Sequence, residues 1–286
     1  MRDLATRKSM RKAMKILLAV DGSEASLAAV EEAAQTPWPE GSIVRIVSVT
    51  DIPFAIESPA KTLKGDPKIV ILDEAERWGA DLIVVGTHGY DALGRIRLSS
   101  VSRVVASHAK CSVKIARHRK TMCADGRAMR ILLAVDGSEF GGAAVEEVAN
   151  RPWPPGSEVH VVSAIHLSFM TTPETWALPD SYCSHLEEAG RELAGSAINR
   201  AISRLLDSNK ERKAPLTLTN EAIVSHAAEA IIETAKKWSA DLVTLGSHGN
   251  SGFKRCLLGS VSYAVASHAP CSVEIVRTPI LQEEKK

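Results

Sequence analysis

Three short stretches in the second half of the chain combine glycines, hydroxyl groups and an acid in a pattern that suits a phosphorylated ligand. They are Asp136-Gly-Ser, Gly246-Ser-His-Gly249 and, after nine intervening residues, Gly259-Ser260-Val261-Ser262. Glycines permit close approach to the backbone and unusual φ angles. A Gly-Ser step that opens a helix presents free N–H groups and the positive end of the helix dipole, which attract anions. The hydroxyl groups of Ser260 and Ser262 add donors, and Asp136 could accept hydrogen bonds from a ribose or an adenine amino group.

Each feature also has a plain structural interpretation. A lone Gly-x-x-Gly is more often a tight turn than a ligand loop. His88 and His248 could contact phosphate or be exposed loop histidines, and Asp136 could be an acid favoured by a helix N-terminus. The position of Asp136 at a strand end favours the ligand role. The His-Ala-x-Cys pattern at 108–111 and 268–271 has too few partners for a metal site, so we expect buried thiols and no metal.

The chain contains two copies of one pattern. Met14–Glu24 recurs as Met129–Glu139 at an offset of 115 residues, and Gly86–Gly89 recurs as Gly246–Gly249 at an offset of 160. The two offsets differ by 45 residues, so the first copy is shorter in its middle. A repeat of this length indicates duplication of a whole domain. We predict a truncated domain over residues 14–117 and a complete domain over residues 129–278.

Alternating apolar and periodic segments predict the elements that position these groups. Short runs rich in Val, Ile and Leu suit strands buried on both faces, and Ala-rich helical segments follow them. The second copy has a long helical segment at 180–206 and a strand at 216–224, whereas in residues 50–78 of the first copy only a helix at 68–78 is clear. We therefore expect the first copy to lack about one helix and one strand. The alternation predicts an α/β fold with parallel sheets and helices on both faces.

Composition excludes several classes of protein. The 286 residues are 45% hydrophobic and 24% charged, with a net charge of +1, which argues against a nucleic-acid or anionic-membrane partner. We expect no transmembrane helix and no secretion signal. Five cysteines without a Cys-x-x-Cys pair favour reduced thiols and a cytoplasmic protein. No P-loop, no GxGxxG after the first strand and no GxSxG elbow is present, so the corresponding enzyme classes are not indicated.

The combination of motifs resembles the universal stress protein (UspA) family. The resemblance rests on Ala-Val-Asp-Gly-Ser at the first strand, Gly-x-x-Gly-x9-Gly-Ser between the last two strands, and the closing segment 268–276. It implies two Rossmann-like domains of the adenine nucleotide alpha hydrolase type, with strand order 3-2-1-4-5 and ATP, with or without Mg²⁺ or Mn²⁺, at the switch point. It also implies that Asp136 and the backbone of Ala164 hold the adenosine. The residues that it places around the phosphates are Gly246, His248, Gly249, Gly259, Ser260, Val261 and Ser262.

The first copy departs from this pattern. Gly86-Thr-His-Gly89 is present, but Ser99-Ser100 stands where the motif has Gly-Ser. A Cβ at Ser99 would obstruct the phosphate approach or strain the backbone. Together with the shorter middle, this predicts one good site in the second copy and a weak or empty site in the first. The residues of that weak site are Asp21, Gly86, Gly89 and Ser100.

The resemblance implies an ATP-binding regulator in a stress response. In the family, domains commonly pair through their last strands, so we expect the two copies to form a pseudo-dimer within the chain and the chain to form a homodimer. Two alternatives stay open. One is a nucleotide-free dimerising scaffold, and the other is a slow ATPase or autokinase, which the lack of an obvious pair of metal-binding acids disfavours.

Overall fold

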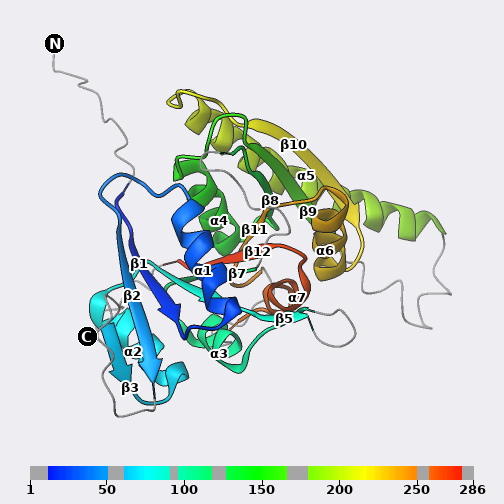
Figure 1. The fold of residues 1–286 in the computed structure, drawn as a ribbon. Coiled ribbons are helices and arrows are strands. Elements are labelled where there is room, and N and C mark those ends of the chain that lie inside the picture. The colour runs from blue at the N-terminus through cyan, green and yellow to red at the C-terminus, as the bar shows by residue number, and fades with distance from the viewer. Residues whose placement is uncertain are drawn as a thin grey trace, which may run out of the picture.

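The computed structural model describes residues 12–50, 61–90, 96–117, 127–165, 180–249 and 258–278. Figure 1 shows strands at the centre with helices packed around them. Residues 14–117 are called the N-terminal repeat below, and residues 129–278 the C-terminal repeat.

The N-terminal repeat alternates strands and helices from its first residues. Its elements are β1 (Lys15–Val20), α1 (Glu24–Gln35), β2 (Ile43–Thr50), β3 (Lys61–Lys64), α2 (Pro67–Trp78), β4 (Leu82–Gly86), the short ribbon β5 (His88–Tyr90) with β6 (Ile96–Arg97), α3 (Ser100–His108) and β7 (Ser112–Ala116).

The C-terminal repeat follows the same order with one more helix. Its elements are β8 (Arg130–Ala134), α4 (Glu139–Asn150), β9 (Glu158–Ile165), α5 (Asp180–Asn209), β10 (Thr217–Val224), α6 (Ala227–Lys237), β11 (Leu242–Gly246), α7 (Ser260–His268) and β12 (Ser272–Val276). Serine caps begin the first helix of both repeats, because the Ser23 and Ser138 side chains accept backbone N–H groups of α1 and α4. None of the described helices, the 30-residue α5 included, is long and apolar enough to cross a membrane.

Ten strands form one sheet in the order β10-β9-β8-β11-β12-β7-β4-β1-β2-β3. Within each repeat the order is 3-2-1-4-5 and all neighbours are parallel, which confirms the predicted fold class. The last strands β7 and β12 pair antiparallel, with Lys114 opposite Glu274, and join the repeats. The two repeats therefore pair within the chain through their last strands. Because β7 and β12 occupy each other, a homodimer, which stays a prediction, would need another surface.

The expectation that the N-terminal repeat lacks a strand is wrong. β3 pairs with β2 at the place where β10 pairs with β9, but β3 has four residues and β10 has eight. The two repeats differ more in the segment between these two strands. Residues 51–60, which separate β2 from β3, lie outside the described part of the chain. They are too few to form a counterpart of the 30-residue α5. The described part of the N-terminal repeat therefore has no counterpart of the 30-residue α5, and its edge strand is half as long as β10.

Helices cover both faces of the sheet. On one face a continuous core crosses both repeats, with Ile71 of α2, Val105 of α3, Ile231 of α6 and Val265 of α7 among its buried residues. On the other face, α4 and α5 cover the C-terminal repeat, whereas α1 packs on a smaller core in the N-terminal repeat. The carboxyl ends of the parallel strands stay open between these layers, and this is the edge where ligands bind in open α/β sheets.

A buried ion network lies at the joint between β7 and β12. Lys114 is fully buried, and its Nζ lies 2.7 Å from a Glu32 carboxylate oxygen and 2.9 Å from the Thr36 hydroxyl. Glu274 on the paired strand accepts hydrogen bonds of 2.6 and 2.7 Å from Arg151. Burial raises the pKa of Glu274, but the charges of Arg151 and Lys114 outweigh burial and lower it. The two repeats thus meet across paired charges.

Candidate functional site

A cavity of about 850 Å³ opens at the carboxyl ends of β8, β9 and β11 in the C-terminal repeat. This volume lies within the roughly 300–1,000 Å³ that is typical of ligand pockets. The structure brings together at its wall all nine residues that the sequence predicts for the main site. They are Asp136, Ala164, Gly246, His248, Gly249, Gly259, Ser260, Val261 and Ser262.

The cavity wall also contains residues that sequence reasoning missed. Gly190, Leu193 and Ala194 of α5 and Ala227 and Ile231 of α6 line it. Helical periodicity identified both helices but did not show which of their faces closes the cavity. These residues make one side of the cavity largely apolar, which suits a planar ring better than a charged group.

Helix α7 begins at this cavity without a side-chain cap. Gly259 is its N-cap residue with extended backbone angles, and no side chain accepts a hydrogen bond from the first turn. The Gly259 N–H itself donates to the Ser247 carbonyl oxygen at 2.9 Å. The first N–H groups of a helix have no acceptor inside the helix. Those of Ser260, Val261 and Ser262, which line the cavity, therefore form a donor set that suits an anion.

The hydroxyl groups of Ser260 and Ser262 are not both available to a ligand, which differs from the sequence-based prediction. Ser262 Oγ donates its proton to the Gly246 carbonyl oxygen at 2.7 Å. Of the donors of Ser262, only the backbone N–H is therefore available to a ligand. Ser260 is exposed and lines the cavity, so its hydroxyl proton can serve a ligand. The prediction of two hydroxyl donors is thus wrong for Ser262.

The glycines permit close packing of protein on protein. A Cβ on Gly246 would lie 2.6 Å from the Phe140 carbonyl carbon, where β11 ends against α4. A Cβ on Gly249 would lie 2.7 Å from Asp136 Oδ2, which puts the glycine loop beside the acid. Neither glycine has a positive φ, so the expected unusual φ angles are wrong, and the close approach at Gly246 is to α4.

Asp136 and His248 are both held by neighbours. Asp136 Oδ1 accepts a hydrogen bond of 2.9 Å from the Ser138 N–H at the start of α4, and the residue remains exposed. It is thus at once a helix N-terminal acid and a cavity residue. His248 is 9% exposed, its ring centroid lies 5.1 Å from that of Phe140, and its Nδ1 lies 3.1 Å from Ser247 Oγ. The exposed-loop interpretation of His248 is therefore wrong, whereas the His88 side chain lies outside the described residues.

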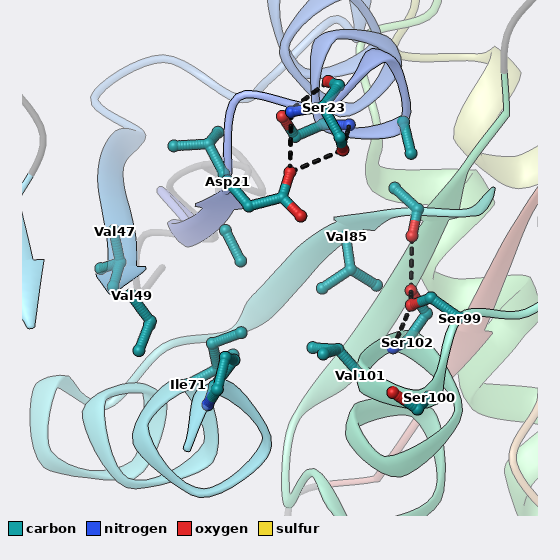
Figure 2. Close-up of a pocket in the computed structure, with 16 residues that line it drawn as sticks. Asp21, Ser23, Val47, Val49, Ile71, Val85, Ser99, Ser100, Val101 and Ser102 are labelled. Carbon is teal, nitrogen blue, oxygen red and sulfur yellow. Dashed lines mark hydrogen bonds between the residues drawn. The ribbon is translucent and has the colours of Figure 1, made fainter. Parts of the chain in front are cut away.

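The N-terminal repeat has a smaller pocket, of about 250 Å³, at the equivalent edge (Figure 2). Asp21, Gly86 and Ser100 of the predicted second site line it, whereas Gly89 lies in β5 and is not among the described lining residues. The volume of this pocket lies below the roughly 300–1,000 Å³ that is typical of pockets for drug-sized ligands.

The start of α3 in this pocket is capped by Ser99. Its Oγ accepts the Ser102 N–H at 2.9 Å and lies 2.7 Å from Ser102 Oγ, which in turn donates to the Gly86 carbonyl oxygen (Figure 2). Ser99 has a φ of −61°, so the expectation of backbone strain is wrong. The hydroxyl, more than the Cβ, changes the site, because it occupies an N–H group that would otherwise bind an anion.

The two cysteines of the His-Ala-x-Cys patterns, Cys111 and Cys271, are both thiols in the described structure. Burial raises the pKa of the Cys111 thiol to about 11, so this thiol is protonated at neutral pH. Cys271 is a buried thiol that forms no disulfide with another described residue. Within the described parts of the chain, no three His, Cys, Asp or Glu side chains are grouped so that they could hold a metal ion.

A model of the Universal stress protein family matches residues 55–117 and 128–277, which is more than half of the chain. The chain belongs to this family. The match covers the C-terminal repeat and the second part of the N-terminal repeat, whereas β1, α1 and β2 precede it.

Curated relatives agree with this membership, and a solved structure shares the fold. The chain is 30% identical over 201 residues to a universal stress protein of Mycolicibacterium smegmatis, and 28% identical over 210 residues to Universal stress protein Rv2005c of Mycobacterium tuberculosis. Each alignment covers 69% of this chain and 62% of the relative, so this universal stress protein matches less than two thirds of their length. A universal stress protein from Archaeoglobus fulgidus shares the fold at 18% identity with a TM-score of 0.58, covering 93% of this chain and 97% of its own.

Proposed function

We propose that this universal stress protein binds ATP in the C-terminal cavity and acts as a nucleotide-dependent regulator in a stress response. The observation that supports the proposal most strongly is the uncapped N-terminus of α7, which opens onto a cavity of about 850 Å³ beside a strand-end carboxylate. An uncapped helix start attracts a phosphate group, and the cavity has room for the rest of a nucleotide.

The chain's own groups divide into two sets in this proposal. The backbone N–H groups of Ser260, Val261 and Ser262 and the Ser260 hydroxyl would bind phosphate oxygens. Asp136 and the backbone of Ala164 at the ends of β8 and β9 would hold the ribose and the base. A bound phosphate would satisfy the helix start that no side chain caps, and ATP occupancy would thereby favour one conformation of the α7 end.

Direct titration tests this proposal. Calorimetry of the full chain with ATP should give one site, and Asp136→Ala should weaken binding by roughly 10-fold, since a hydrogen bond to a charged group contributes about 1.5–3 kcal/mol. Asp241→Ala is the matched control, because Asp241 accepts its hydrogen bond from the Arg130 N–H, outside the cavity-lining set.

The two alternatives give different results. A chain that releases no nucleotide on denaturation and takes up none in the titration would be the nucleotide-free scaffold, and the proposal would then be abandoned. Steady-state release of phosphate with added Mg²⁺ or Mn²⁺ would instead identify the slow ATPase, and label retained on the protein would identify the autokinase.

A further inference from the structure

The pocket of the N-terminal repeat has mainly apolar walls. Val47 and Val49 of β2, Ile71 of α2, Val85 of β4 and Val101 of α3 surround it (Figure 2). The polar groups among its lining residues are the Asp21 carboxylate and a few serine hydroxyl groups. Apolar walls with a few polar groups are typical of ligand pockets, and the volume of about 250 Å³ limits the occupant to a compact molecule.

The described lining of this pocket offers fewer hydrogen-bond donors to an anion than the lining of the C-terminal cavity does. None of the described residues that line it is Lys, Arg or His. The Ser99 hydroxyl accepts the Ser102 N–H at the start of α3, so the helix offers fewer free donors than α7 does. A phosphate group that enters here would lose hydration and would gain fewer contacts from the described residues than it would at the start of α7.

The acid in the pocket supplies a hydrogen-bond acceptor, as Asp136 does at the wall of the C-terminal cavity. Asp21 Oδ1 accepts hydrogen bonds of 3.0 Å from the Ser23 N–H and 2.6 Å from the Ser23 hydroxyl. Burial raises the pKa of Asp21, but these hydrogen bonds and that of Ser26 outweigh burial and lower it. The carboxylate is therefore charged at neutral pH, and it can accept a hydrogen bond from a ligand that carries a donor.

From these observations we infer that the N-terminal pocket is a second ligand site, which takes an uncharged molecule of nucleoside size or smaller and rejects its phosphorylated form. Apolar walls bind the body of the ligand, and Asp21 accepts a hydrogen bond from it. The inference does not depend on ATP binding in the C-terminal cavity, because the two sites share no lining residue.

A ligand series that differs only in phosphate tests the inference. Equilibrium dialysis of the full chain with labelled adenosine and labelled ATP counts the moles bound per chain. We expect two adenosine sites and one ATP site. Asp21→Ala should remove one adenosine site and leave ATP binding unchanged, and Asp21 is exposed, so the variant should fold.

The reciprocal variant is Ser99→Gly, which removes the cap of α3 and gives the N-terminal repeat the Gly-Ser step of the other repeat. It should strengthen ATP binding in the N-terminal pocket at least several-fold over the wild-type background. Asp66→Ala serves as a control, since it also removes a side-chain cap, that of α2. Asp66 itself does not line the pocket.

Three results would overturn the inference. They are one adenosine site per chain with no effect of Asp21→Ala, two ATP sites in the wild type, or adenosine binding that Asp136→Ala abolishes completely. Loss of ATP binding alone, with an adenosine site that still depends on Asp21, would refute the proposed ATP function and leave this inference standing.

Discussion

The two repeats use the same residue position at the start of their last helix in opposite ways. Ser99 caps α3 with its own hydroxyl, whereas Gly259 leaves α7 uncapped. In both repeats the serine three positions later donates to the carbonyl oxygen of the glycine that ends the fourth strand. The two repeats therefore share the hydrogen bond that ties this helix to the fourth strand. A single hydroxyl group decides whether the helix start is capped by the protein or is available to a ligand.

The repeats also differ in what covers the sheet. In the C-terminal repeat α5 buries Val159 of β9 completely, and Val145 of α4 is 6% exposed. At the equivalent positions of the N-terminal repeat, 115 residues earlier, Val44 is 41% and Val30 38% exposed. In the described part of the N-terminal repeat no helix takes the place of α5, which in the C-terminal repeat supplies both a cavity wall and part of a core.

The largest effect is expected where the repeats meet. Lys114 and Glu274 occupy equivalent positions with opposite charge, and Lys114→Met would leave Glu32 buried without its cation. Removing one partner of a buried ion pair costs about 3–5 kcal/mol. Urea unfolding should show this loss. Lys12→Met is the control, because Lys12 and Asp81 form an exposed pair that contributes at most about 1 kcal/mol. Equal losses in both variants would contradict the description of the Lys114–Glu32 pair as a buried ion pair.

The second prediction exchanges the capping residue. Gly259→Ser should weaken ATP binding by about 10- to 100-fold, because its hydroxyl would take an N–H group that contributes roughly 1.5–3 kcal/mol to a charged ligand. Calorimetry with ATP measures the change. Gly259→Ala separates crowding from capping, since its Cβ would lie 3.1 Å from the Ser247 carbonyl oxygen but brings no acceptor. Similar losses for Ser and Ala would show that crowding, and not the cap, distinguishes the repeats.

The third prediction concerns the face that α5 covers. Val159→Ala should lower the free energy of unfolding by about 2 kcal/mol, since two buried methyl groups are lost and a cavity remains. Val44→Ala is the matched variant in the N-terminal repeat and should change it by less than about 0.5 kcal/mol. Chemical denaturation measures both. A large loss for Val44→Ala would mean that this face is covered in solution, by a second chain or another segment.

The sequence predicted the framework and the ligand-facing residues better than it predicted their contacts. The internal repeat and the buried strand patterns gave the order of elements, and Ser23 and Ser138 marked helix starts. The sequence did not predict β3, because its segment Lys-Thr-Leu-Lys has one apolar residue and lies at an exposed edge. Hydrophobic alternation is weak in such a strand. The packing role of Gly246 depends on Phe140, 106 positions earlier, and no local pattern connects two such residues.

The smallest effect concerns a carboxylate that only the N-terminal repeat has, since the residue equivalent to Glu74 is Thr234. The Glu74 side chain is buried, and its carboxylate accepts hydrogen bonds from Arg77, Lys61 and Arg45. Burial raises the pKa of Glu74, but these three cations outweigh burial and lower the pKa from 4.5 to about 2. Because the pKa is lower in the folded state, the ionised group stabilises the protein above pH 4.5, and this contribution disappears as the pH falls toward 2.

Glu74→Gln should therefore lower the free energy of unfolding by about 1 kcal/mol at pH 7, a value that allows for solvent screening around the exposed cations. The difference from wild type should shrink between pH 4.5 and pH 2. Thermal unfolding at several pH values measures it, and Glu76→Gln, whose partner Lys110 is exposed, is the control that should show little pH dependence. A difference that stays constant down to pH 2 would mean that Glu74 acts through packing, and the N-terminal repeat would then lack the charge-based support that sets it apart from its partner.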